Sequence, residues 1–213
     1  MLFAILLVAA VAVLAVRQHR RYGNAADEAV PPIPYAQMLD GDLAFRNGRG
    51  IYSEFLLMTK KQSPDTVYYS HIGLVVNNMS DDGDHWVIVH AVPDEPDFKG
   101  DFDRVKMSSP EEFFSTEKAY HGELVHTGVE FPRHLVREAL DFVRDSVRFD
   151  NDYDLEDPAK LYCTELIHRL YSKLGTDLTE GRRSYGFMTV FHHPVIQPVD
   201  IWLYKEKDRY FIF

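Results

Sequence analysis

The sequence predicts an α+β domain in which an antiparallel sheet packs against helices. Residues 67–78 and 85–92 are rich in β-branched and aromatic side chains, and the turn-forming run "MSDDGD" separates them, which is typical of a β-hairpin. Residues 133–147 carry apolar side chains at helical spacing, and a second stretch with this spacing begins at Cys163. In a chain of 213 residues, this mixture fits one full-sized domain with its own core.

The chain begins with the unbroken apolar run "MLFAILLVAAVAVLAV", which a basic segment follows. The run is slightly shorter than the roughly 20 residues that span a bilayer, a deficit that tilt or local thinning accommodates. We therefore expect residues 1–21 to be a hydrophobic membrane anchor or an uncleaved signal. The arginines after the run place the body of the chain on the cytoplasmic side by the positive-inside rule. A signal peptide is the alternative, and it would place the body in the periplasm or outside the cell.

Local patterns predict the remaining organisation. Residues 22–38 mix small, acidic and proline residues and are expected to be a linker, so that the domain covers 39–213. In chain order we expect a short strand at 41–46, a helix at 51–61, the hairpin, a short helix at 109–114 capped by Ser109, a strand at 122–131, the helix at 133–147, and a terminal hairpin at 200–213 that turns at 205–208.

The charge and cysteine content exclude several classes of protein. The formal net charge is −10 at neutral pH, whereas binding to nucleic acid needs clustered lysine and arginine, so we expect no nucleic-acid partner. The single cysteine cannot form an internal disulfide, and one thiol is too few for a structural zinc site.

Two further patterns resemble metal sites but lack essential ligands. Residues 150–158 carry side-chain oxygens at alternate positions, as an EF-hand loop does at its start. Leu155 and Leu161, however, stand where that loop needs glycine and glutamate. His192 and His193 are adjacent, so their side chains diverge in a helix or a strand. We therefore expect neither a metal nor another cofactor.

Cys163 is expected in the first turn of a helix. Pro158 interrupts any preceding helix, and after it the segment "CTELIHRLYSKL" has apolar residues at helical spacing. At a helix start, the unpaired backbone N–H groups and the helix dipole favour an anion, which lowers the pKa of a thiol. The same N–H groups are placed to hold an oxyanion.

A neighbouring imidazole also lowers the pKa of a thiol, and two histidines lie on the predicted hairpin. His71 stands near the start of the first strand and His90 near the end of the second, so an antiparallel hairpin makes them neighbours. One could then act as a base for Cys163 while the other orients it, as in cysteine enzymes. An inert core cysteine and two structural histidines are the alternative.

The segments "GDLAFRNGRG", "YSHIGLVV", "VIVHAV" and "YDLEDPAKLYCTELIHRLY" resemble, in order and spacing, the permuted NlpC/P60 papain-like family, in particular its YiiX/YebB-like branch. The resemblance covers about residues 39–175. It implies a permuted papain-like fold in which Cys163 is the nucleophile, His71 the general base and His90 the third, polar residue. Histidine at the third position departs from the glutamate common in this branch, and a neutral group would support an imidazolium–thiolate pair less strongly.

The resemblance also implies a function. It indicates a cysteine hydrolase or acyltransferase that acts on an amide or ester bond through a thioester, with a peptidoglycan peptide, another wall fragment or a lipid as the substrate. The membrane is an expected partner through the N-terminal helix. Tyr162 is a candidate for supporting the oxyanion and Ser70 flanks the base, although a structural role is open for both. A non-catalytic, membrane-tethered binding module with the same fold is the alternative function.

Overall fold

The computed structural model describes residues 30–49, 53, 69–79, 83, 85–185 and 194–212. The expected membrane anchor and nearly all of the expected helix at 51–61 lie outside the described residues, as do His192 and His193. Among the helices in the described ranges, none has both the length and the hydropathy needed to cross a bilayer.

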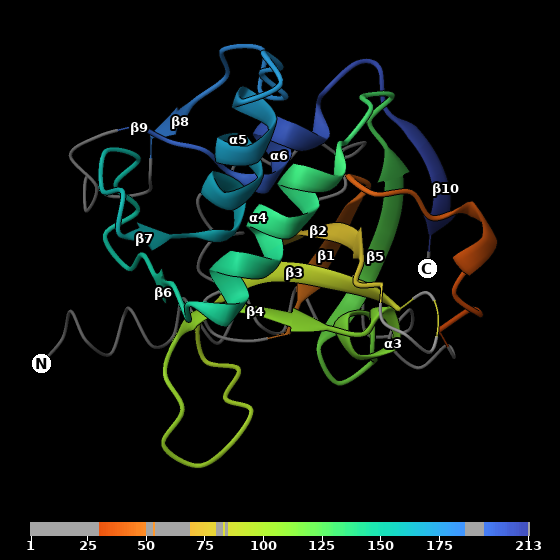
Figure 1. Cartoon of the computed structure of the whole chain (residues 1–213), viewed down its shortest axis with the longest axis horizontal. Helices are drawn as coiled ribbons and strands as arrows, with labels where there is room; N and C mark the ends of the chain where they lie inside the picture. Colours follow the sequence, from red (N-terminus) through yellow and green to blue (C-terminus); the bar gives the residue numbers. More distant parts are fainter. Residues whose placement is uncertain are drawn as a thin grey trace, which may run out of the picture.

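One large sheet forms the centre of the molecule. Its strands are β1 (Leu43–Gly48), β2 (His71–Asn77), β3 (Trp86–Val92), β4 (Arg104–Ser108), β5 (Ala119–His126), β6 (Arg148–Phe149), β7 (Lys160–Leu161) and β10 (Asp208–Ile212). They are ordered β10-β5-β1-β2-β3-β4-β6-β7 (Figure 1). Neighbouring strands are antiparallel apart from β6 and β7, which are parallel. A separate small pair consists of β8 (Ser184–Tyr185) and β9 (Pro194–Val195).

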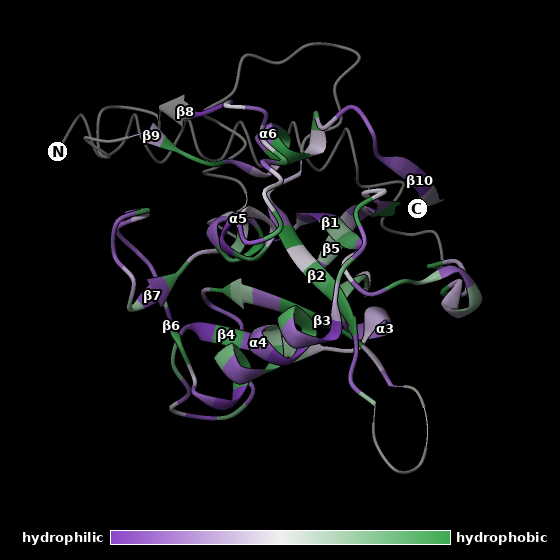
Figure 2. Ribbon diagram, turned by 45° about the horizontal axis from the view of Figure 1, so that its top comes forward, coloured by the Kyte–Doolittle hydropathy of each residue, from purple (hydrophilic) through white to green (hydrophobic). Residues whose placement is uncertain are grey.

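Helices cover both faces of this sheet. They are the 3-10 turn η1 (Tyr35–Gln37) and the helices α3 (Pro110–Phe113), α4 (Arg133–Arg144), α5 (Cys163–Ser172) and α6 (Pro198–Trp202). Helices α4 and α5 lie across one face, over β2, β3 and β4 (Figure 1). The core between these two helices and the sheet is built from side chains such as Ile72, Val89 and Leu166. On the other face of the sheet, Phe113 of α3 packs with Val75 and Ile88. Strand β2 is accordingly buried along its whole length and mostly apolar, in contrast to the largely exposed and mostly hydrophilic edge strand β10 (Figure 2).

The predicted hairpin and the helices predicted at 109–114, at 133–147 and from Cys163 are confirmed in their main features. Strands β2 and β3 pair in antiparallel register, with Leu74 opposite Val89. The helix predicted at 133–147 is α4, and Cys163 begins α5 as expected. Ser109 caps α3, because its hydroxyl accepts a hydrogen bond of 3.1 Å from the backbone N–H of Glu112.

The prediction of a terminal hairpin at 200–213 is wrong. Its first arm belongs to α6, which Pro198 begins and in which the Asp200 carboxylate accepts the backbone N–H of Gln197 at 2.7 Å. Proline and this cap favour a helix start, so they outweigh the β propensity of the residues that follow. The second arm, β10, pairs instead with β5.

The packed part of the chain includes residues from the predicted linker at 22–38. Turn η1 lies there, and Met38 is only 3% exposed. Val30 and Ile33 pack against the same core cluster as Met38.

Candidate functional site

The two histidines of the predicted hairpin lie together. The register of β2 and β3 brings His90 close to Gly73, so that His71 is its diagonal neighbour on the same face of the sheet. The Nε2 atom of His71 and the Nδ1 atom of His90 are 2.8 Å apart, and both side chains are buried. On its other side, the Nε2 atom of His90 is 3.3 Å from the hydroxyl of Ser108 on β4. The result is a buried chain of three polar side chains across three strands.

Gly73 makes room for this pair. A Cβ atom at this position would lie 2.3 Å from Cγ2 of Ile88 and 3.3 Å from Cβ of His90. We expect Gly73→Ala to lower the free energy of unfolding by about 1–3 kcal/mol, because overpacking forces neighbouring side chains to move. Chemical denaturation measures the loss. Adding Ile88→Ala removes the clashing methyl group, so the double variant should lose less than the sum of the single losses; strict additivity would contradict the steric explanation.

Cys163 lies at the junction of α5 and β2. It is the first residue of α5 and is 7% exposed. The backbone N–H groups of Ile72, Thr164 and Cys163 itself each act to lower the pKa of its thiol, because they favour a thiolate. Since Ile72 directly follows His71, this effect on the thiol comes from the strand that carries the histidine, and α5 packs against that strand.

Burial dominates the protonation of these groups. It raises the pKa of the Cys163 thiol to about 11, a larger effect than the lowering by the backbone N–H groups and by Arg46. It also lowers the pKa of His71 and of His90 well below 6.5, and the positive charge of Arg46 adds to this. The expectation that Cys163 has a lowered pKa is therefore wrong for this conformation, because loss of hydration outweighs the helix start. At neutral pH the thiol and both imidazoles are uncharged.

A buried arginine lies next to the histidines. Arg46 on β1 is 2% exposed, its guanidinium is 4.6 Å from the centre of the Phe113 ring, and it donates a 3.1 Å hydrogen bond to the Phe113 carbonyl. The same ring packs against both imidazoles. Arg46 also forms an ion pair with Glu95, from the loop between β3 and β4. Glu95 thus supplies the countercharge for a guanidinium that is buried beside the histidines.

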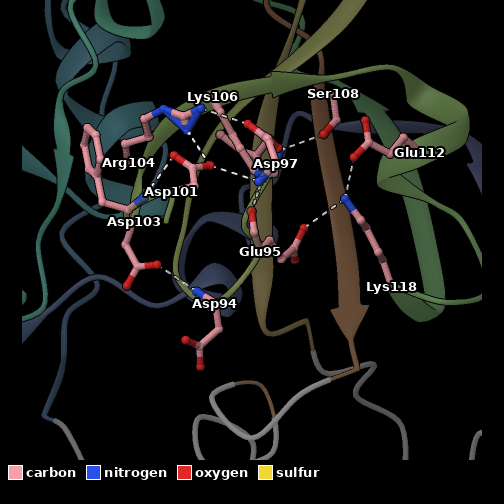
Figure 3. Close-up of polar contacts among 12 residues, drawn as sticks. Asp94, Glu95, Asp97, Asp101, Asp103, Arg104, Lys106, Ser108, Glu112 and Lys118 are labelled. Carbon is pink, nitrogen blue, oxygen red and sulfur yellow. Dashed lines mark hydrogen bonds and ion pairs between the residues drawn. The ribbon is translucent and has the colours of Figure 1, made fainter. Parts of the chain in front are cut away.

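Further ion pairs hold this loop, residues 93–103, against the sheet (Figure 3). Lys118 bridges Glu95 and Glu112, at 3.2 and 2.6 Å. Asp97 binds both the Lys106 ammonium, at 2.7 Å, and the Arg104 guanidinium, at 2.9 Å. The loop is therefore fastened on the side of the sheet where the histidine pair is buried.

Sequence reasoning missed Arg46, Glu95 and Ser108. The available signal was a charged residue inside the apolar run of β1, where only a paired charge is tolerated. Its partner is 49 positions away along the chain, so no local pattern identifies it. Ser108 ends β4, a strand that was not predicted.

Tyr162 and Ser70 make structural contacts. The Tyr162 hydroxyl accepts the backbone N–H of Ile196 at 3.2 Å, and its ring packs against Tyr153. The Ser70 hydroxyl accepts the backbone N–H of Gly48 at 2.8 Å, which ties β1 to the start of β2. A catalytic supporting role for either side chain stays a prediction.

These elements define a class of mixed α/β protein with one large sheet, a few helices, and a helix that begins at a cysteine beside a strand that begins at a histidine. The fold is similar to that in the crystal structure of the metalloprotein YiiX from Escherichia coli O157:H7, DUF1105, with a TM-score of 0.58 and 14% sequence identity. The match covers 82% of this chain and 97% of the YiiX chain, and it supports the YiiX-like fold. No protein-family model and no curated protein sequence matches the chain.

Proposed function

We propose that the chain is a cysteine hydrolase or acyltransferase with a permuted papain-like active site. One observation carries the proposal: His71 and His90 are in hydrogen-bonding contact at 2.8 Å at the start of the strand β2, against which the helix that Cys163 begins is packed. Cysteine enzymes use this combination of a nucleophile at a helix start, a histidine base and a second polar group that orients the base.

The proposed reaction begins from uncharged groups. The sulfur of Cys163 attacks the carbonyl carbon of an amide or ester while Nδ1 of His71 takes the thiol proton, and a thioester forms as the leaving group departs with that proton. Backbone N–H groups at the start of α5 stabilise the oxyanion. Water or another acceptor then cleaves the thioester and regenerates the thiol. Because neither partner is ionised beforehand, proton transfer accompanies attack rather than preceding it.

The pH dependence of thiol alkylation tests this protonation state. With a pKa of about 11, only roughly one Cys163 in ten thousand is a thiolate at pH 7. We expect the rate of alkylation by iodoacetamide to rise about tenfold per pH unit from pH 7 until the thiol titrates near pH 11. The same measurement in denaturant gives the unperturbed profile as a control.

His71→Ala separates two mechanisms in this assay. For a neutral pair, the alkylation profile keeps its high midpoint in the variant while turnover is lost. For a preformed imidazolium–thiolate pair, the wild-type midpoint lies below the free-cysteine value and returns towards it in the variant. A thiol that reacts at no pH in the folded protein would favour the second candidate, a non-catalytic binding module, which the 7% exposure of Cys163 also suits.

Trapping of the acyl-enzyme intermediate on Cys163 identifies the class of substrate. We propose a wall peptide or a lipid ester as the substrate and the apolar segment 1–21 as the attachment to a membrane. Incubation with peptidoglycan peptides and with phospholipids, followed by mass spectrometry, should show an acyl adduct on Cys163 that is absent in Cys163→Ala. A topology reporter fused after residue 213 shows which class of substrate is accessible to the domain. A cytoplasmic position favours lipid or protein esters, and an outward position favours wall peptides.

A metal-dependent reaction is the other option, because YiiX is described as a metalloprotein. The described residues do not fit it. No group of three His, Cys, Asp or Glu within the described ranges could hold a metal ion, and the facing nitrogens of His71 and His90 bind each other. No step of the proposed reaction therefore runs through a metal.

A further inference from the structure

Ser108 is the outer member of the polar chain that starts at His71. It ends β4 (Figure 3) and lies opposite Ile88 on β3. Ser108 is 4% exposed, and its hydroxyl is 3.3 Å from Nε2 of His90. The reaction described above gives this residue no part.

The chain of hydrogen bonds has two directions, and they have opposite consequences. A neutral imidazole carries one N–H, so the 2.8 Å contact needs a proton on either His71 Nε2 or His90 Nδ1. If His71 donates, His90 carries its proton on Nε2 and donates to Ser108, and Nδ1 of His71 is left with a free lone pair. If His90 donates, Ser108 donates to His90, and His71 holds its proton on Nδ1, where it cannot act as a base.

We propose that Ser108 is a positioning residue whose oxygen accepts the N–H of His90 and thereby holds His71 in the tautomer with an unprotonated Nδ1. The direction of the chain rests on the proposed function, because only this tautomer accepts the proton of Cys163. The dependence on Ser108 rests on burial: His90 is 0% exposed, so without the serine oxygen its Nε2–H has no water to replace it. A buried donor without a partner is costlier than a buried acceptor without one, so the pair then reverses direction.

Long-range ¹H–¹⁵N spectra of the histidine side chains test the proposal directly. In the wild type we expect the His71 signals to show an unprotonated Nδ1 and those of His90 an unprotonated Nδ1 with a protonated Nε2. In Ser108→Ala both patterns should reverse, and in Ser108→Thr, which keeps the hydroxyl, they should return. Single His71→Gln and His90→Gln variants assign the signals. A wild-type His71 with a protonated Nδ1, or a pattern that Ser108→Ala leaves unchanged, overturns the proposal.

Acetylation of Cys163 by p-nitrophenyl acetate, followed by mass spectrometry, gives the functional readout. We expect the rate at neutral pH to fall about tenfold or more in Ser108→Ala and to recover in Ser108→Thr. Ser109→Ala is the matched control, because it removes the cap of α3 at the adjacent position and should change neither the spectra nor the acetylation rate. An absent reaction in the wild type with the expected spectra contradicts the enzyme and leaves the role of Ser108 intact. A normal acetylation rate in the wild type, together with spectra that Ser108→Ala leaves unchanged, supports the proposed enzyme and overturns the role of Ser108.

Discussion

Glu95→Ala is expected to lower the free energy of unfolding by about 3–5 kcal/mol, because it leaves the charge of Arg46 buried without its partner. The Arg46 side chain is 2% exposed, so water cannot replace the lost carboxylate. Its remaining contacts, the Phe113 carbonyl and the Phe113 ring, carry no full negative charge. Chemical denaturation of the wild type and the variant measures the difference.

Two comparisons isolate the cause of this loss. Asp141→Ala breaks an ion pair on α4 whose side chains are 47% and 68% exposed, and it should cost no more than about 1 kcal/mol. The double variant Arg46→Met/Glu95→Leu removes both buried charges, so it should be more stable than Glu95→Ala alone. If Glu95→Ala costs as little as Asp141→Ala, the loop does not provide the countercharge of Arg46.

The second large effect is expected in acid. The folded-state pKa values of His71 and His90 lie well below 6.5, chiefly because both rings are buried, whereas the unfolded chain has ordinary values. As the pH falls below about 6.5, the unfolded chain takes up protons that the folded protein refuses. The free energy of unfolding therefore falls by up to about 1.4 kcal/mol per pH unit for each histidine, and the loss continues down to the folded-state pKa values.

Denaturation at a series of pH values between 7 and 5 gives this slope. The double variant His71→Gln/His90→Gln should flatten it, although its stability at pH 7 will differ from that of the wild type. His134→Gln, on the exposed surface of α4, is the control for the loss of a histidine as such. An unchanged slope in the double variant would show that other groups cause the acid sensitivity.

Periodicity was enough to predict the hairpin and the cysteine helix. Both elements carry their pattern within about a dozen residues, and the pairing of two adjacent strands brings His71 to His90 without long-range information. Helix α6 takes the place of the strand predicted at 200–204. The aromatic and β-branched residues there indicate a strand, but Pro198 and the capping carboxylate of Asp200 start a helix. There, capping outweighed intrinsic propensity.

Burial was the part that sequence patterns could not predict. A helix start and a nearby imidazole both lower a thiol pKa, but the core around Cys163 removes water and raises it to about 11. The buried charge of Arg46 was equally unpredictable, because its partner Glu95 is a loop residue 49 positions later in the chain. Effects that depend on which distant segments cover a group are set by the tertiary structure.

The pairing of β10 with β5 has a consequence for the nascent chain. Asp208 pairs with His126, so β5 leaves the ribosome about 80 residues before its outer neighbour. At ordinary rates of translation this interval is roughly 4–16 s, during which one edge of β5, with its apolar Leu124 and Val125, has no strand beside it. An unprotected edge recruits strands from other chains, so a chaperone that shields it during synthesis should raise the yield of monomeric protein.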